Sequence, residues 1–171
     1  MSGVFPKQIQ DALQTAEGLY YRLVLLVGKT GSGKTAVLRD VAEALGTSVI
    51  NINLALSSEL LELTAKKRSL QLPELLGVIT DKAMSPVVLD NLEILFDKDL
   101  KQDPLRLLQG ISRNQAVVAS WNGSMTSGRL LYAEHGHPEY RSYDSVDALI
   151  VSMDSAPTHD PAIIKSERGE A

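Results

Sequence analysis

The sequence contains no cysteine, few aromatic residues and no long apolar run. The missing cysteines exclude disulfides and thiolate metal sites. Only three histidines are present, and His135 and His137, which flank Gly136, have no evident third ligand nearby, so we interpret them as part of a loop and not as metal ligands. No apolar run reaches the roughly 18–20 residues of a membrane span, and the N-terminus lacks the charged-then-apolar order of a signal peptide. We therefore expect a cytoplasmic protein without a membrane segment.

Length and composition are those of an ordinary globular domain. The chain has 171 residues, of which 44% are hydrophobic and 22% are charged. A chain of this length fits one domain, which we place at residues 1–154, followed by a flexible C-terminal tail at 155–171 because prolines and charges accumulate there. The net charge of −4 does not indicate DNA binding, although it leaves room for a local basic patch.

Five short apolar or β-branched segments predict the strands of a buried parallel sheet. They span residues 22–27, 48–53, 86–89, 116–120 and 147–152. Helical patterns separate them, and further helices are expected at 6–19, from Ser57 or Ser58 to about Lys67, from Pro73 to about Ala83, and near 104–112. Residues 122–145 look like a loop with a broken helix. This alternation predicts a three-layer α/β fold with a five-stranded parallel sheet in the order 5-1-4-3-2.

The first strand runs directly into a P-loop. Residues 28–35 satisfy the Walker A pattern and comprise Gly28, Lys29, Thr30, Gly31, Ser32, Gly33, Lys34 and Thr35. Such a loop lets backbone N–H groups surround a phosphate at the N-terminus of the next helix. Its lysine is expected to be exposed and to bridge the β- and γ-phosphates, while the threonine hydroxyl binds Mg²⁺. The pattern predicts ATP and Mg²⁺ as cofactors.

The third predicted strand ends at Asp90, as a Walker B aspartate would, and Asp90 is therefore the second expected Mg²⁺ ligand. The residue that activates water is less well defined. Many AAA+ ATPases have glutamate directly after this aspartate, but here that position is Asn91. Glu93 is the candidate base, with a solvated loop charge as the alternative. Asn91 could orient water instead, but an amide is a poor base.

Two further groups complete the predicted site. Asn122 or Ser120, at the end of the fourth strand, would face the γ-phosphate as a sensor, whereas a simple turn at Asn122 is the alternative. Trp121 is expected to pack in the core. Arg141 and Arg129 lie in the segment that often faces a neighbouring subunit's nucleotide in ring-forming ATPases, where a guanidinium stabilises transition-state charge.

Several stretches together resemble the BrxF family, the small P-loop proteins of type 3 BREX bacteriophage-defence systems. They are the P-loop, residues 87–96, the Ser-Trp-Asn-Gly at 120–123, and Tyr-Ala-Glu-His-Gly-His-Pro-Glu-Tyr-Arg at 132–141. The resemblance covers about residues 20–152. It implies an AAA+-like ATPase that acts with other BREX defence proteins, among them a methyltransferase, a large ATPase, a phosphatase-like protein and a helicase.

The sequence also departs from the wider AAA+ pattern, because only about 20 residues follow the fifth strand and a helical lid domain is not expected. We therefore predict an ATPase that is slow alone and works as a homo-oligomer, serving as a switch or assembly component. A small-metabolite kinase and a non-hydrolysing nucleotide-binding module are the alternatives.

Overall fold

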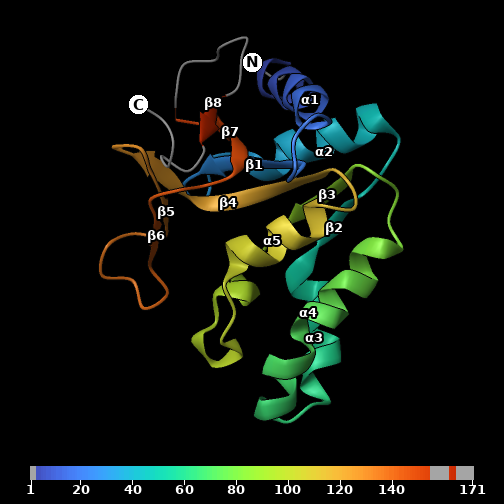
Figure 1. Cartoon of the computed structure of the whole chain (residues 1–171), viewed down its shortest axis with the longest axis vertical. Helices are drawn as coiled ribbons and strands as arrows, with labels where there is room; N and C mark the ends of the chain where they lie inside the picture. The colour runs from blue at the N-terminus through green and yellow to red at the C-terminus, as the bar shows by residue number, and fades with distance from the viewer. Residues whose placement is uncertain (1–2, 155–161, 165–171) are drawn as a thin grey trace.

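A parallel sheet forms the middle layer of the computed structural model, which describes residues 3–154 and, for the backbone only, residues 162–164 (Figure 1). Its strands lie in the order β2-β3-β4-β1-β7, which confirms the predicted order. All four pairs of neighbours are parallel. The strands are β1 (Leu23–Gly28), β2 (Val49–Asn51), β3 (Val87–Asp90), β4 (Val117–Thr126) and β7 (Ala148–Ser152).

Helices cover both faces of the sheet, so the predicted three-layer α/β fold is confirmed. The helices are α1 (Val4–Ala16), α2 (Lys34–Leu45), α3 (Ile52–Leu61), α4 (Ala65–Asp81) and α5 (Pro104–Ser112), with short 3₁₀ turns η1 (Glu93–Phe96) and η2 (Lys98–Leu100). Successive side chains of a strand point to opposite faces. Val24 and Leu26 accordingly pack with α1 and α2, whereas Leu25 and Val27 pack with α3, α4 and α5.

The helices before β3 differ from the prediction. Asn51 caps α3 by accepting a hydrogen bond from the backbone N–H of Leu54 at 3.1 Å, so this helix begins before Ser57 and Ser58. Pro73 lies inside α4 and does not open a new helix. Thr64 caps α4, and burial of Leu72 and Leu76 on both sides of the proline offsets the hydrogen bond that proline cannot donate.

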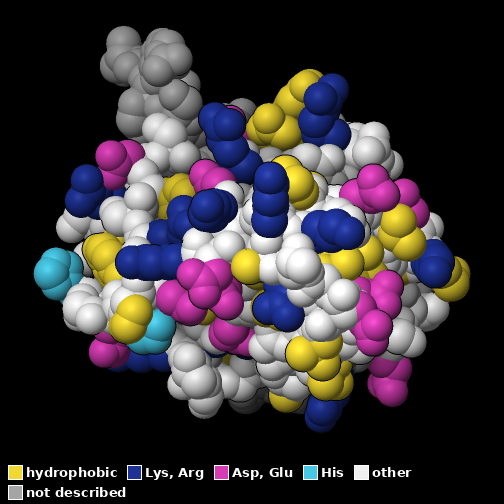
Figure 2. All heavy atoms as spheres, turned by 90° about the horizontal axis from the view of Figure 1, so that it is seen from below, with side chains coloured by type: hydrophobic (Ala, Val, Ile, Leu, Met, Phe, Trp, Pro, Cys, Tyr) yellow, Lys and Arg dark blue, Asp and Glu magenta, His cyan; other side chains and the backbone are white. Residues whose placement is uncertain are grey.

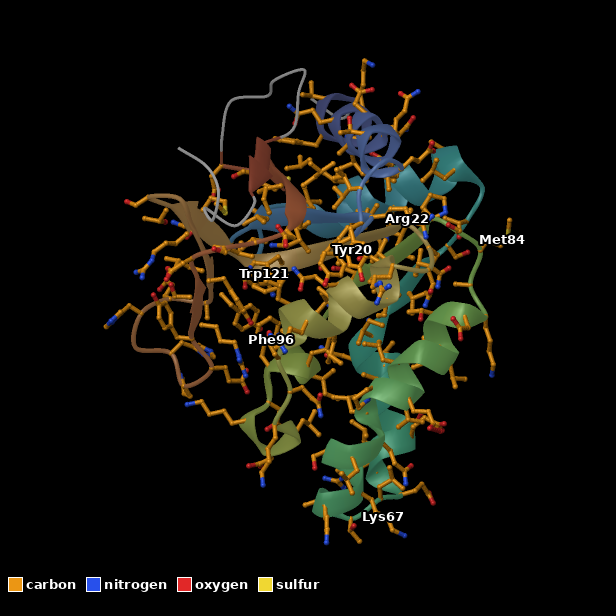
Figure 3. All side chains as sticks on the ribbon, in the orientation of Figure 1. Tyr20, Arg22, Lys67, Met84, Phe96 and Trp121 are labelled. Carbon is orange, nitrogen blue, oxygen red and sulfur yellow. The ribbon has the colours of Figure 1, made fainter. Side chains whose placement is uncertain are left out.

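The segment at 122–145, predicted to be a loop with a broken helix, is a β-hairpin extension. β4 continues past the sheet and pairs antiparallel with β5 (Arg129–Tyr132), which pairs with β6 (Arg141–Tyr143). Trp121 and Phe96 lie beside this extension, between it and α5 (Figure 3), and Tyr132 stacks on Phe96 with ring centroids 3.4 Å apart. These aromatic contacts bury one face of the hairpin extension and so stabilise regular strands where a loop was predicted. The expected packing role of Trp121 is confirmed, because the side chain is 1% exposed.

Most of the predicted tail at 155–171 lies outside the described residues. Within it, Ala162–Ile164 form β8, which pairs antiparallel with β7 and adds a strand to that end of the sheet. An apolar, partly β-branched triplet beside an unpaired strand edge accounts for this pairing. Among the described residues, no helix combines the length and the apolar character that crossing a membrane requires.

Candidate nucleotide-binding site

The P-loop joins the end of β1 to the start of α2, as its sequence predicts. Gly31 and Gly33 have φ angles of 83° and 101°, in the left-handed region that favours glycine. A Cβ on Gly28 would lie 2.6 Å from Ser32 Oγ and 2.9 Å from Met153 Cβ, so the turn closes tightly there. The free N–H groups of the first turn of α2 therefore point into the curve of the loop, where an anion is stabilised.

Lys34 occupies the centre of this loop, and the expectation that it is exposed is wrong. Its side chain is only 5% exposed. The ammonium donates hydrogen bonds to the carbonyl oxygens of Gly28 at 2.8 Å and Lys29 at 2.7 Å, and it lies 3.4 Å from Ser32 Oγ. Burial lowers the pKa of Lys34, and the neighbouring carboxylates Asp90, Glu93 and Asp154 oppose this shift. The loop thus holds a cation whose partners are the backbone carbonyls that surround the phosphate position.

Asp90 connects the P-loop helix to the central strand of the sheet. Its Oδ2 accepts a hydrogen bond from Thr35 Oγ1, and its Oδ1 accepts one from Ser120 Oγ, both at 2.7 Å. Asp90 and Ser120 are buried. A hydroxyl and a carboxylate in contact beside a P-loop are the oxygen ligands that Mg²⁺ takes in nucleotide sites, so these residues fit the predicted metal. Ser120, one of the two predicted sensor residues, thus contacts Asp90 directly, and its sensor role stays a prediction.

Glu93 lies at the start of η1 and is held on both sides by amides. Its Oε1 accepts from Asn53 Nδ2 at 2.9 Å, and its Oε2 accepts from Asn122 Nδ2. Asn53 is fixed in turn, because its Oδ1 accepts the backbone N–H of Ile94 at 2.9 Å. The structure thus brings together the proposed base and the proposed sensor. Asn53, at the start of α3, was missed; an amide directly after the second strand was the available signal.

These side chains surround a pocket of about 500 Å³ at the carboxyl edge of the sheet. Its lining residues are Thr30, Gly31, Gly33, Lys34, Thr35, Asp90, Asn91, Glu93 and Asn122. Asn91 has a φ of 56°, a left-handed conformation that asparagine tolerates better than most residues. Ligands of open α/β sheets bind at this edge, and the arrangement of cation, hydroxyl, carboxylates and helix N-terminus suits a nucleoside triphosphate.

The two candidate arginines lie outside the pocket of their own chain. Arg129 forms an exposed ion pair with Asp144 on the hairpin extension. Arg141 donates from Nη2 to the carbonyl oxygen of Gln102 at 2.8 Å. Action on a neighbouring subunit's nucleotide remains a prediction for both, and either guanidinium would have to exchange its present contact to do so.

Comparison with known proteins supports this assignment. The model of the ATPase family associated with various cellular activities (AAA) matches residues 24–117, more than half of the chain. The matched segment runs from β1 to the start of β4 and so contains the P-loop, Asp90 and Glu93. No curated protein and no solved structure matches the chain.

Proposed function

Because the chain belongs to the AAA family of ATPases and is an ATP-binding P-loop protein, we propose that it hydrolyses ATP with Mg²⁺ in the pocket at the carboxyl edge of the sheet. One observation carries the proposal. Thr35 Oγ1 and Ser120 Oγ each donate a hydrogen bond of 2.7 Å to a different carboxylate oxygen of Asp90. The buried ammonium of Lys34 lies in the same pocket. The arrangement pre-positions the groups that catalysis of phosphoryl transfer requires.

Each residue has a distinct task in this proposal. The N–H groups of the P-loop and Lys34 bind the phosphates. Thr35 and Asp90 would hold Mg²⁺, which when bound would neutralise phosphate charge. Glu93 accepts the proton of the attacking water, and Asn53 and Asn122 keep its carboxylate in place. Each Glu93 oxygen accepts one amide hydrogen bond and retains a lone pair that can bind water.

Phosphate release from ATP, measured without any added acceptor, tests the proposal. We expect release from the wild-type protein and a loss of at least about a hundredfold in Asp90→Asn. Asp99→Asn, which removes an exposed carboxylate of η2, is the matched control and should behave as wild type. Nucleotide binding without release would indicate a non-hydrolysing module. Turnover that appears only when a phosphoryl acceptor is added would indicate a kinase.

We further propose that the protein acts as a homo-oligomer in which Arg141, or else Arg129, of one subunit reaches the ATP of the next. A finger supplied in trans raises phosphoryl transfer by roughly 10³–10⁵-fold. Neither arginine lines the pocket of its own chain, so a neighbouring subunit would have to supply the guanidinium. Mass measurements with and without ATP test assembly. Mixing Arg141→Ala with Lys34→Ala protein should restore part of the activity, and failure of restoration in a stable oligomer would contradict the role of Arg141.

The resemblance to the BrxF family supports a role as a switch or assembly component of a BREX phage-restriction complex. Co-purification with BREX proteins, in the presence and absence of ATP, tests that role. A nucleic-acid partner is not part of the proposal. The face drawn in Figure 2 carries several lysine and arginine side chains, but acidic side chains lie among them, so this face offers no continuous basic surface.

A further inference from the structure

A second cleft opens beside the nucleotide pocket, between the P-loop and the hairpin extension. It has a volume of about 960 Å³ and shares Thr30, Glu93 and Asn122 with the nucleotide pocket. Its other walls come from β4, from β5 and from the loop at 133–140 that leads to β6. In Figure 1 this loop extends away from the sheet. The cleft therefore joins the water-activating end of the nucleotide pocket to the molecular surface.

Negative charge dominates the cleft. Three carboxylates line it, those of Glu93, Glu134 and Glu139, against one ammonium, that of Lys29. His135 and His137 also line the cleft, and His137 Nδ1 accepts a hydrogen bond from the backbone N–H of Glu139 at 3.0 Å. These carboxylates also affect Tyr132 in the wall of the cleft. Burial raises the pKa of Tyr132, and the charges of Glu93 and Glu139 raise it further.

The walls between these carboxylates are apolar and aromatic. Leu131, Tyr132, Ala133 and Tyr140 all line the cleft. Tyr132 is held in place and only 5% exposed, because its ring is stacked on Phe96 with an interplanar angle of 5°, whereas Tyr140 is partly exposed. A long side chain with an aliphatic stem and a cationic head matches such a surface, since the stem packs on the rings while the head meets carboxylates.

The loop that carries the carboxylates has a defined conformation. The N–H of His137 donates to Glu134 O at 2.9 Å, and the N–H of Tyr140 donates to His137 O at 3.1 Å. At its base the N–H of Ala133 donates to Asn122 O at 2.9 Å. The backbone that carries Glu134 and Glu139 is thus ordered before any ligand arrives, which reduces the entropy lost on binding.

We propose that this acidic and aromatic cleft binds an arginine side chain presented by a partner polypeptide. Arginine fits better than lysine because its planar guanidinium can both stack on the partly exposed ring of Tyr140 and pair with carboxylates. Among the described residues, this chain's own Arg129 and Arg141 are bound to Asp144 and Gln102, so neither fills the cleft of its own chain. The proposal rests on the geometry of the cleft and does not require hydrolysis. Because Glu93 and Thr30 belong to both cavities, an occupant would also contact the nucleotide site.

Trp121 provides the measurement. It is the only tryptophan of the chain, its Nε1 donates to the carbonyl of the cleft residue Leu131 at 3.0 Å, and its ring centroid lies 5.8 Å from that of Tyr132. The nucleotide-free protein is titrated with the tripeptide Gly-Arg-Gly and, as a neutral isostere, with Gly-citrulline-Gly. Tryptophan emission and the backbone amide NMR signals of residues 131–140 are followed together.

We expect saturable changes with the arginine peptide, with Kd on the order of 1 mM for a single side chain. Citrulline peptide should bind at least about tenfold more weakly, as should arginine peptide to the double variant Glu134→Gln/Glu139→Gln. Glu59→Gln/Glu62→Gln, which removes two exposed carboxylates of the α3 region, is the charge-matched control and should keep wild-type affinity. Equal binding of the two peptides, wild-type affinity of the double variant, or no change in either signal would overturn the proposal. Failure of the protein to hydrolyse ATP would not overturn it, because the titration contains no nucleotide.

Discussion

Replacement of Glu93 by glutamine tests whether this carboxylate activates water. Glutamine keeps the shape of the side chain and removes its basicity. In the structure the side-chain amides of Asn53 and Asn122 donate to separate carboxylate oxygens of Glu93. The amide of Asn53 cannot rotate by half a turn without losing its hydrogen bond to the N–H of Ile94. The side chain of Asn122 makes only its hydrogen bond to Glu93 among the described residues, so its amide can rotate and accept from the new glutamine. The site can therefore accommodate Glu93→Gln by one side-chain flip.

The expected loss of stability is smaller than the expected loss of rate. Hydrogen bonds to a charged group contribute about 1.5–3 kcal/mol each, and neutral ones contribute about 0.5–1.5 kcal/mol. Two partly buried bonds that lose their charge should together cost about 2–3 kcal/mol of unfolding free energy. Loss of a general base lowers turnover by roughly 10²–10⁴-fold, equivalent to about 3–5 kcal/mol of activation free energy.

The assay separates these effects. ATP affinity of Glu93→Gln should stay close to wild type and its unfolding free energy should fall by only about 2–3 kcal/mol, while steady-state phosphate release falls by about a hundredfold or more. Glu59→Gln, a change of the same chemistry on the exposed surface of α3, is the control and should leave release unchanged. If Glu93→Gln keeps turnover within about tenfold of wild type, Glu93 is not the base and the role passes to Asn91 or to another group.

Three further predictions follow from single contacts. Ser120→Ala leaves one oxygen of buried Asp90 without its donor and should lower the unfolding free energy by about 1–3 kcal/mol in denaturant titrations. Gly123→Ala places a Cβ 1.8 Å from a backbone carbonyl oxygen of β5 and should lower the unfolding free energy by about 3 kcal/mol or more. Its control, Gly110→Ala, has open space on α5 and should be neutral or stabilising by up to about 1 kcal/mol. If Gly123→Ala is as stable as wild type, the hairpin packing is wrong. Burial raises the pKa of Tyr143, so above its ordinary value of 10 the unfolded chain loses this proton first and stability falls with rising pH; melting curves of Tyr143→Phe should show a smaller alkaline loss.

The sequence predicted the parts of the fold that depend on local patterns. The apolar segment predicted to be the first strand forms β1, which is buried throughout. The predicted strand order is found as well, with β4 between β1, which leads into the P-loop, and β3, which ends at Asp90. Thr35 and Asp90 were both predicted to bind one Mg²⁺, and they are in contact.

Features that depend on tertiary contacts were not predictable from local patterns. Pro73 indicates a helix start, but packing on both sides keeps it within α4. Glycines at 123 and 128 suggested a loop, yet Gly123 is needed because the β5 backbone approaches it closely. The burial of Lys34 was missed since its partners are backbone carbonyls, which no side-chain pattern reports.

The edges of the sheet limit how copies of this chain can associate. In the described part of the chain, the strands that end the hydrogen-bonded network are β2, β8 and β6, and each is three residues long. Such short edges give a second sheet little backbone to pair with, and proteins use them to oppose edge-to-edge aggregation. Assembly of this protein should therefore proceed through side-chain surfaces, be reversible on dilution, and leave the β-sheet signal in circular dichroism unchanged.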